Sequence, residues 1–304
     1  MADYLPELPD ALSMPMRAPA AGDDSIELPT LEHVPVVILA GGRGTRLAPY
    51  TSVLPKPLMP VGEQSILEIV VGQLAECGAR EINLCVGYLA HLIRAVFDHR
   101  VRRDVEITYI YEEDALGTAA PLRLVNGLDD TFIVMNGDVL TTLDYRELLR
   151  HHRERGNLLT IATHNRSIKI DYGMLHLDVA ERVQAFEEKP EIVSPVSMGI
   201  YVMDPEVLEY IPPDAKFDFP QLVQTLLERG APVGAYRYGG MWFDIGRADD
   251  HERAVAAWAE GRLGPADPHV NGNLTGASTN GATPAAPSPR PRPRRTSRQR
   301  QRNT

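Results

Sequence analysis

The chain has 304 residues, of which 43% are hydrophobic and 24% charged, with two cysteines and a formal net charge of −10. This composition is typical of a globular protein of one or two domains and excludes a disulfide-rich scaffold. No run of eighteen apolar residues and no signal-peptide pattern is present, so we expect a soluble, cytoplasmic protein that makes no membrane contact.

The charge is unevenly distributed along the chain. Residues 1–32 carry a net charge of −6 and residues 263–304 carry +6, which leaves −10 on the residues between them. Both end segments lack a sustained hydrophobic period. We therefore predict a flexible acidic arm at 1–32, a folded domain at 33–261 and a disordered basic tail at 262–304. The tail could contact nucleic acid or an acidic partner, but it has no interleaved aromatic residues, so we interpret it as solvated.

Strands and helices alternate through the first part of the folded domain. A short β-branched run at 36–40 ends in glycines and predicts a buried strand. The alternation predicts an α/β fold, with a Rossmann-like, mostly parallel sheet and helices on both of its faces. The other predicted strands are 82–86, 106–111, 132–135 and 158–163, and the predicted helices are 66–75, 118–125 and 145–153.

The pattern changes to shorter segments after residue 163. We predict strands at 174–177, 183–186, 198–203 and 233–238, and a closing helix at 249–260. These strands are expected to form a small mixed β region around a substrate pocket.

A glycine-rich loop follows the first predicted strand, with the sequence Leu39-Ala40-Gly41-Gly42-Arg43-Gly44-Thr45-Arg46-Leu47. Ligands of open α/β sheets bind beyond the carboxyl ends of the strands. Glycines let backbone N–H groups approach a phosphate, and the two arginines add cationic donors. The loop lacks the Gly-Lys-Ser/Thr of a Walker loop, and taken alone it is equally consistent with a plain tight turn.

Lys56 stands between Pro55 and Pro57, whose φ angles are fixed. Such rigidity suits a lysine aimed at a phosphate and has no purpose for a surface lysine. Together, the glycine loop and Pro55-Lys56-Pro57-Leu58 resemble the signature of the sugar-nucleotide pyrophosphorylases, which are sugar-1-phosphate nucleotidyltransferases. The resemblance covers roughly residues 36–259.

This resemblance implies the nucleotide-diphospho-sugar transferase fold, with 33–261 as the catalytic domain. It implies a reaction between a sugar 1-phosphate and a nucleoside triphosphate that releases pyrophosphate. The implied catalytic residues are Arg46, Lys56 and Asp138. The implied nucleotide-binding residues are Leu39, Ala40, Gly41, Gly42, Gly44, Thr45, Arg46, Glu112, Gly117 and Thr118.

Two aspartates follow predicted strands, in Asn136-Gly137-Asp138 and in Trp242-Phe243-Asp244-Ile245-Gly246. Either aspartate alone could be a turn or capping residue. By the resemblance, Asp138 and Asp244 hold Mg²⁺, an ion that prefers one or two carboxylates plus substrate phosphates. The histidines and cysteines show no metal-ligand spacing.

Glu187-Glu188-Lys189-Pro190 looks like the family's sugar-phosphate motif. The resemblance implies that Lys189 grips the sugar's phosphate and Glu188 accepts hydrogen bonds from ring hydroxyls. The alternative is a solvated charged turn before proline. Tyr172, Gly173 and Gly199 stand where the family lines its sugar pocket, although either glycine could be a bulge.

Glu112 lies five residues before Gly117, where thymidylyl and uridylyl relatives usually carry glutamine. A carboxylate only accepts hydrogen bonds, and guanine presents two adjacent donors, so this position favours GTP. The segments 57–62 and 217–220 look like those of mannose- or heptose-1-phosphate guanylyltransferases. The segment 115–117 departs from the Pro-Leu-Gly that is usual in these enzymes. The identity of the substrate, a sugar or a sugar-like cyclitol, is therefore left open.

Several alternatives remain open. Glu112 could be a solvated acid at a strand end, with Glu113 or a backbone group reading the base. The enzyme could be a thymidylyl- or uridylyltransferase acting on glucose 1-phosphate, or the chain could be a non-catalytic regulatory relative. The expected marker of that last class is loss of Lys56, Asp138 or Asp244, and all three are present. We expect a homo-oligomer of unspecified size.

Overall fold

The computed structural model describes residues 28–42, 44, 47, 49–100, 104–112, 116–246 and 248–263. All of these belong to the first of two units into which the chain divides, residues 1–271 and 272–304. Most of the predicted acidic arm and nearly all of the predicted basic tail lie outside the described residues. So do Arg43, Thr45 and Arg46 of the glycine loop.

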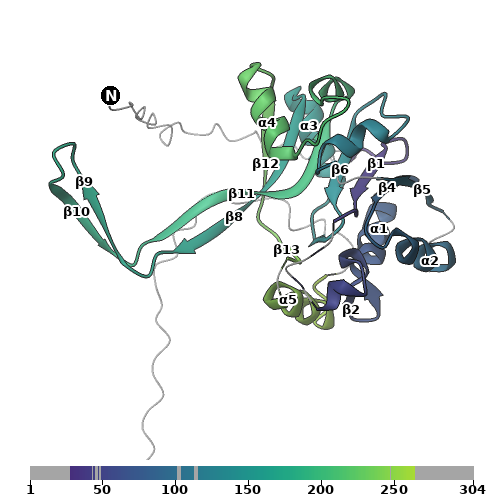
Figure 1. The fold of residues 1–304 in the computed structure, drawn as a ribbon, viewed down its shortest axis with the longest axis horizontal. Coiled ribbons are helices and arrows are strands. Elements are labelled where there is room, and N and C mark those ends of the chain that lie inside the picture. The colour runs from purple at the N-terminus through teal and green to yellow at the C-terminus, as the bar shows by residue number, and fades with distance from the viewer. Residues whose placement is uncertain are drawn as a thin grey trace, which may run out of the picture. The chain divides into compact units, whose positions relative to one another are not determined.

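A seven-stranded sheet forms the centre of this unit, in the order β12-β8-β11-β6-β1-β4-β5 (Figure 1). Neighbouring strands are parallel except on the two sides of β11, which runs antiparallel to β6 and to β8. The predicted mostly parallel sheet is confirmed. The strands are β1 Val36–Leu39, β4 Glu81–Val86, β5 Glu106–Tyr111, β6 Phe132–Asn136, β8 Leu159–Lys169, β11 Glu191–Met203 and β12 Val233–Tyr238.

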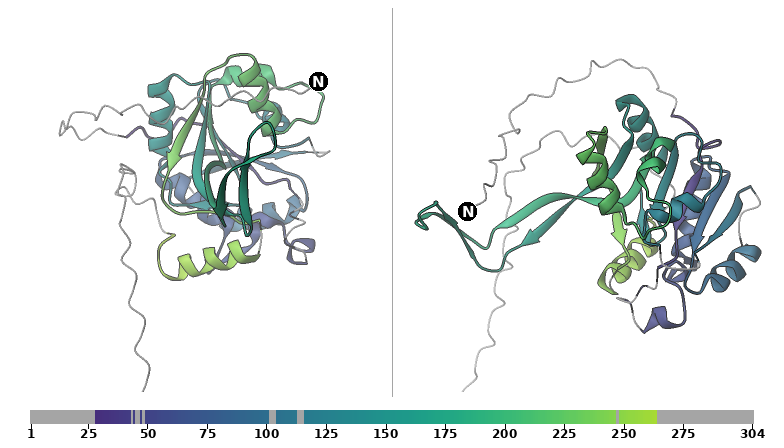
Figure 2. Two further views of the ribbon diagram at one scale, coloured as in Figure 1. Left: turned by 90° about the vertical axis from the view of Figure 1, so that its left-hand side faces the viewer. Right: turned by 45° about the horizontal axis from the view of Figure 1, so that its top comes forward.

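Helices cover both faces of the sheet (Figure 2), as predicted. Successive side chains of a strand point to opposite faces, so Val36 and Ile38 join one apolar core while Val37 joins the other. The first core packs against α1, α2, α3 and α5, and the second against α4 and the 3₁₀ turn η4. The elements are α1 Ile66–Glu76, α2 Ala90–Arg100, η4 Ala120–Leu124, α3 Tyr145–Arg155, α4 Phe219–Glu228 and α5 Ala248–Ala259.

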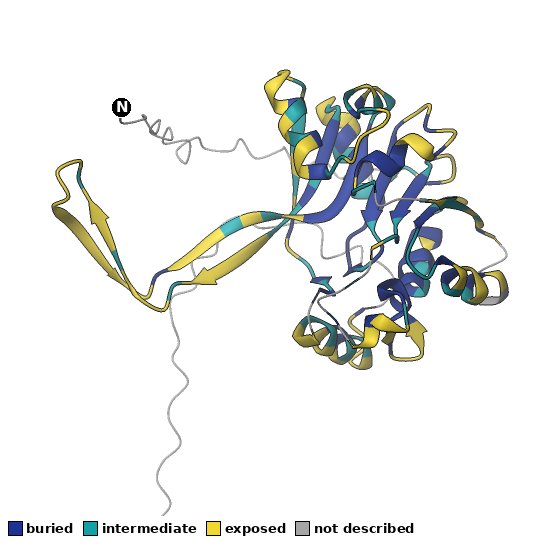
Figure 3. Cartoon of the chain, viewed as in Figure 1, coloured by how far each residue is buried: buried dark blue, intermediate teal, exposed yellow. Residues whose placement is uncertain are grey.

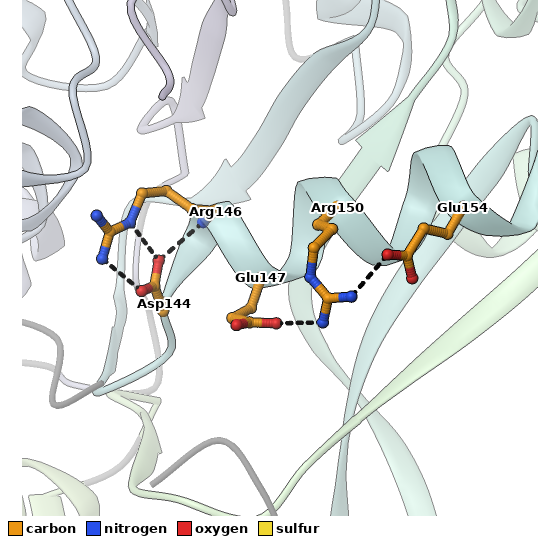
Figure 4. Close-up of polar contacts among 5 residues, drawn as sticks. All are labelled: Asp144, Arg146, Glu147, Arg150 and Glu154. Carbon is orange, nitrogen blue, oxygen red and sulfur yellow. Dashed lines mark hydrogen bonds and ion pairs between the residues drawn. The ribbon is translucent and has the colours of Figure 1, made fainter. Parts of the chain in front are cut away.

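Buried polar groups fix the start of α3 (Figure 4). The fully buried Asp144 caps this helix and accepts hydrogen bonds from the backbone N–H of Arg146 at 2.9 Å and from its guanidinium at 2.7 and 3.0 Å. Further along the helix, Arg150 bridges Glu147 and Glu154 at 2.6 and 2.7 Å. A buried carboxylate needs such partners because desolvation penalises its charge. The hydrogen bonds of Asp144 therefore fix the first turn of the helix.

Several predicted elements need correction. The predicted helix at 118–125 is only the 3₁₀ turn η4, in which Pro121 has no backbone N–H to continue a helix. Helices α2 and α4 were not predicted. The core also includes Leu31 and Leu263, which are buried.

The predicted β region around the pocket is only partly right. The segment 233–238 is the edge strand β12 of the main sheet. The segments 174–177 and 183–186 lie in β9 Gly173–Leu177 and β10 Val183–Glu188, an antiparallel pair outside the main sheet. Beyond residue 164, β8 pairs only with β11, so residues 165–195 form a β-arm. Most of its side chains are exposed, including Tyr172, Leu175, Val183 and Phe186 (Figure 3).

None of the helices in the described part of the chain combines the length and the apolar character that crossing a membrane requires.

Candidate active site

The glycine loop is held against the ends of neighbouring strands. After β1, the backbone N–H of Ala40 donates to the carbonyl of Cys85 at 2.8 Å. The N–H of Gly137 donates to the carbonyl of Leu39 at 2.9 Å, which brings the turn after β6 against the loop. Gly44 has a φ of +60°, and a β-carbon there would lie 3.2 Å from Cβ of Lys56. The loop, the turn after β6 and the lysine are therefore packed together.

Lys56 lies between the two aspartates predicted to bind metal. Its Nζ donates a hydrogen bond to Oδ2 of Asp138 and lies 3.8 Å from Oδ1 of Asp244. The lysine side chain is only 8% exposed. It starts the 3₁₀ turn η3 Lys56–Leu58, which Pro55 precedes, so the flanking prolines hold this buried cation in place.

Two short strands bring the aspartates together. β7 Val139–Thr141 pairs antiparallel with β13 Trp242–Asp244, and Asp244 lies opposite Val139. Asp138 precedes β7 directly. The carboxylates are therefore neighbours although they are far apart in the sequence.

The aspartate pair fits a divalent cation. Oδ1 of Asp138 is buried and has no hydrogen-bond partner among the described residues, so a coordinating oxygen is available. No cluster of three or more His, Cys, Asp or Glu side chains occurs in the described part of the chain. Mg²⁺ does not need one, because it commonly uses one or two carboxylates and takes its other ligands from water and phosphate.

Glu112 turns from the end of β5 toward the glycine loop. A β-carbon at Gly41 would lie 2.7 Å from Oε1 of Glu112, so glycine is what allows this approach. Burial raises the pKa of the Glu112 carboxyl, and a hydrogen bond from the backbone N–H of Leu116 lowers it in part. This half-buried position argues against the interpretation of Glu112 as a fully solvated acid. Glu113, which that alternative assigns to reading the base in place of Glu112, lies outside the described residues.

Gly117 and Thr118 contact the start of α4. Gly117 has a φ of +94°, and a β-carbon there would come within 2.6 Å of the carbonyl oxygen of Phe217. The Thr118 hydroxyl accepts a hydrogen bond from the N–H of Phe219 at 2.9 Å and lies 3.3 Å from Oδ1 of Asp218. These contacts give both residues a structural role, and their nucleotide-binding role stays a prediction.

A cavity of about 490 Å³ has Asp244 in its lining. Gly199 lines it with a φ of +74°, and the side chain of Asn136 occupies the space that a β-carbon at this glycine would need. The lining residues are Asn136, Val139, Arg166, Ser167, Ile168, Val196, Ser197, Met198, Gly199, Trp242 and Asp244.

The other predicted sugar-phosphate residues do not line this cavity. Tyr172, Gly173, Glu188 and Lys189 lie on the β-arm and are exposed, Tyr172 to 80%. Gly173 packs under the ring of Phe186, and Lys189 has a φ of +48°. The structure therefore brings together Lys56, Asp138, Asp244 and Gly199. The four residues of the β-arm lie outside this site.

The family model for nucleotidyl transferases matches residues 35–261 of this chain. The chain belongs to the nucleotidyl transferase family. This confirms the family resemblance of the sequence motifs.

Named relatives of this nucleotidyl transferase act on different nucleotides. The UTP–glucose-1-phosphate uridylyltransferase of Synechocystis sp. is 33% identical over 239 residues, 72% of this chain and 62% of the relative. A probable mannose-1-phosphate guanylyltransferase of Oryza sativa is 31% identical over 232 residues, 71% of this chain and 62% of the relative. The chain thus spans less than two thirds of the length of these relatives.

A solved structure supports the fold of the nucleotidyl transferase. HddC from Yersinia pseudotuberculosis is 25% identical, with a TM-score of 0.58, covering 74% of this chain and 99% of that one.

Asn136, Trp242 and Arg166 are among the residues lining the cavity of this nucleotidyl transferase that were not predicted as site residues. Asn136 and Trp242 stand inside the two aspartate motifs, but no pattern of residues around them indicates a function. Arg166 stands in a segment where neither apolar alternation nor a motif is present. Its position became visible only through the pairing of β8 with β11.

Proposed function

We propose that this protein is a sugar-1-phosphate nucleotidyltransferase, which joins a sugar 1-phosphate to a nucleoside triphosphate and releases pyrophosphate. The observation that carries the proposal is the position of Lys56 between Asp138 and Asp244, against the glycine loop. Backbone N–H groups, a buried cation and two carboxylates are the groups that a reaction between two polyanions needs. The names of the relatives support the same activity.

The proposed reaction is an in-line attack by a phosphate oxygen of the sugar 1-phosphate on the α-phosphate of the nucleotide. The attacking oxygen is already anionic near neutral pH, so no protein group has to remove a proton. The side chains therefore act by positioning the two phosphates and by neutralising their charge. In this role Lys56 offsets charge on the triphosphate and on the departing pyrophosphate, and Arg46 is proposed to assist it.

Asp138 and Asp244 are the residues proposed to hold Mg²⁺. When bound, the ion would supply positive charge between the α-phosphate and the incoming phosphate. Lys56 neutralises the same carboxylates in the structure described here. The lysine thus offsets the repulsion between the two carboxylates.

We propose GTP as the nucleotide, with mannose 1-phosphate or a heptose 1-phosphate as the sugar substrate. Glu112 supports this, because its carboxylate beside Gly41 can accept both hydrogen bonds from the pairing edge of guanine. The guanylyltransferase of Oryza sativa and the HddC structure in complex with GMP-PN support the same choice. The second candidate is uridylyl or thymidylyl transfer to glucose 1-phosphate, which the Synechocystis relative favours.

A non-catalytic role is the competing class of function. A non-catalytic protein would not need Lys56, Asp138 and Asp244 to lie close together, yet these side chains meet in one site. The geometry therefore favours an enzyme. The cytoplasmic location, the homo-oligomer and the limits of the two end segments stay predictions.

The test is a panel of five nucleoside triphosphates against mannose, heptose and glucose 1-phosphates, read by pyrophosphate release with and without Mg²⁺. We expect Mg²⁺-dependent turnover that is highest with GTP and mannose or heptose 1-phosphate. Turnover led by UTP or dTTP with glucose 1-phosphate would select the second candidate. No pyrophosphate release in any combination would overturn the enzyme proposal.

A further inference from the structure

The segment 116–120 is hydrogen-bonded to the residues that begin α4. The backbone N–H of Phe217 donates to the carbonyl of Leu116 at 2.8 Å. In return, the carbonyl of Phe217 accepts hydrogen bonds from the N–H groups of Ala119 and Ala120 at 2.9 and 3.1 Å. These bonds hold together two segments that are far apart in the sequence, so the start of α4 determines the path of the backbone at 116–120.

The carboxylate of Asp218 holds the same segment at a second point. Its Oδ1 accepts hydrogen bonds from the backbone N–H of Thr118 at 2.9 Å and from the hydroxyl of this threonine at 3.3 Å. The hydroxyl in turn accepts a hydrogen bond from the N–H of Phe219 at 2.9 Å. A β-carbon at Gly117 would lie 2.8 Å from Oδ1 of Asp218, so the carboxylate lies directly against the backbone of the segment. Asp218 therefore fixes the backbone at residues 117 and 118.

The start of α4 is anchored to the central sheet. Asp218 is the N-cap residue of this helix, and its backbone N–H donates to Oε1 of Gln221 at 2.8 Å. The buried ring of Phe219 stacks on the ring of Tyr201 in β11, with centroids 4.3 Å apart and planes inclined by 2°. Such a pair resists displacement, because moving the ring would expose a large apolar surface. The carboxylate of Asp218 thus projects from a well-supported position.

The segment held by Asp218 in turn orients Glu112. The backbone N–H of Leu116 donates a hydrogen bond to the Glu112 carboxylate, and Oε1 of this carboxylate lies close to Gly41 of the glycine loop. Leu116 is held at its carbonyl by Phe217, and the two residues that follow it are held by Asp218, which limits where its N–H can point. A path of hydrogen bonds therefore leads from α4 to the carboxylate proposed to read the base.

We infer that Asp218 is a positioning residue for nucleotide choice, which holds the carboxylate of Glu112 in place through the segment 116–118. The inference rests on the proposed function, in which Glu112 reads the base. A polar site discriminates between bases only when its donors and acceptors are held in place, because otherwise they move to relieve a mismatch. Loss of the Asp218 carboxylate should therefore weaken discrimination between nucleotides more than it weakens binding of the phosphates, which all nucleotides share.

Nucleotide affinity tests the inference without turnover. Calorimetric titration with GTP and with UTP, in the presence of Mg²⁺, gives the ratio of the two Kd values for each variant. Asp218→Ala should weaken binding of GTP roughly tenfold and binding of UTP about twofold at most, as expected when one charge-assisted hydrogen bond is misplaced. Asp218→Asn keeps an oxygen that can accept hydrogen bonds from Thr118, so it should retain most of the wild-type ratio. An unchanged ratio in Asp218→Ala would overturn the inference.

Two further variants separate positioning from damage to α4, which would lower the affinity for both nucleotides alike. Glu228→Ala removes an exposed acid at the other end of the helix and should bind both nucleotides as wild type does. Asp218→Gly also lacks the carboxylate, and glycine is tolerated at helix N-caps. It takes the place of Asp218→Ala if thermal unfolding shows that the alanine variant is not folded, and the same change in the Kd ratio is expected.

A double-mutant cycle tests whether Asp218 acts through Glu112. In a Glu112→Gln background, Asp218→Ala should change the ratio of the two Kd values less than about twofold, because the carboxylate that it positions is gone. Equal effects in both backgrounds would show that the two residues act independently, and this would overturn the inference.

The outcomes also separate this inference from the proposed function. A wild type that binds UTP more tightly than GTP would refute the guanine assignment, whereas a preference that Asp218→Ala reduces would still support the role of Asp218. A wild type that binds nucleotides with the expected effect of Asp218→Ala, but releases no pyrophosphate, would refute nucleotidyl transfer and support the inference.

Discussion

The backbone N–H of Ile245 donates a hydrogen bond of 3.0 Å to the carbonyl oxygen of Asp138. This bond continues the pairing of β7 with β13 past their ends, so the two aspartates are fixed by backbone geometry rather than by side-chain contact. Two like charges held close together repel each other, and Lys56 between them offsets this repulsion. The backbone pairing thus places the two aspartates next to each other, and the lysine offsets their charge.

Replacing either aspartate should remove activity without unfolding the protein. Asp138→Asn and Asp244→Asn keep side-chain size but weaken the binding of a divalent cation, so each should lose nearly all Mg²⁺-dependent turnover. Pyrophosphate release over a Mg²⁺ titration measures this, and thermal unfolding checks the fold. Asp129→Asn, an exposed acid outside the site, serves as the matched control. Near wild-type turnover of either site variant at low Mg²⁺ would show that its carboxylate is not a ligand.

Lys56→Ala should lower kcat by roughly 10²- to 10³-fold, because it removes a fixed cation that acts mainly on the transition state. The carboxylates would lose their counterion as well, so added Mg²⁺ should raise the Tm of this variant more than that of wild type. Initial rates and thermal unfolding with and without Mg²⁺ measure both effects. A variant that retains its kcat would remove Lys56 from the proposed mechanism.

Asp144→Ala should destabilise the protein by about 2–3 kcal/mol, because it removes a helix cap and leaves the N–H groups of Arg146 without their buried acceptor (Figure 4). Glu154→Ala removes only an exposed ion pair on the same helix and should cost about 0.5 kcal/mol at most. Urea unfolding of both variants measures the difference. Equal losses in the free energy of unfolding would show that Asp144 stabilises the protein no more than a surface charge does.

Stability should fall below neutral pH because of His152. This buried ring contacts the hydroxyl of Thr160 at 2.8 Å and a carboxylate oxygen of Asp204 at 3.1 Å. Burial lowers the pKa of His152, although the Asp204 carboxylate opposes the shift. The unfolded chain therefore binds the proton more readily, and the stabilising effect of the neutral ring is lost as pH falls from about 6.5.

Urea unfolding at pH 7.5 and 5.5 measures this dependence. His152→Gln should reduce the difference between the two pH values, whereas His176→Gln, an exposed histidine of the β-arm, should leave it unchanged. A wild-type stability that rises on acidification through this range would contradict the assignment.

The glycine loop and Asp138 were predictable because each follows a buried strand of the main sheet, β1 or β6, and parallel strands place their carboxyl ends at one edge. Asp244 ends β13, which pairs antiparallel with β7 outside the main sheet, so its role was predicted from the family resemblance and not from its strand. Helix α2 was missed because few of its residues, among them Ile93 and Phe97, face the core, which is too few for a clear helical period. The strands at 174–177 and 183–186 of the β-arm were predicted, but the extensions of β8 and β11 into it, residues 165–169 and 191–195, were missed. Most side chains of these extensions are exposed, so no apolar alternation marks them, and Arg166 could not be placed before the pairing of β8 with β11 was known.

Glu112→Gln should selectively impair the use of GTP. The carboxylate beside Gly41 is proposed to accept hydrogen bonds from two donors of guanine, and an amide would present a donor to one of them. Such a mismatch in a half-buried site costs about 1–3 kcal/mol, or roughly ten- to hundredfold in kcat/KM. The kcat/KM values for UTP and dTTP should fall less, because the pairing edges of these nucleotides suit an amide. Competition among the three nucleotides, in wild type and variant, measures the change in preference.

The control is Glu106→Gln, a change of an exposed glutamate at the opposite end of β5, which should leave the preference for GTP unchanged.

The raised pKa of Glu112 adds a second expectation. As pH falls, this carboxyl takes up its proton before an ordinary glutamate does and loses its acceptor character, so the preference for GTP should decline in wild type but not in Glu112→Gln. The guanine assignment fails if the variant keeps the wild-type preference, or if wild type itself prefers UTP or dTTP. Neither result would affect the roles proposed for Lys56, Asp138 and Asp244, since these side chains act on phosphates that all the nucleotides share.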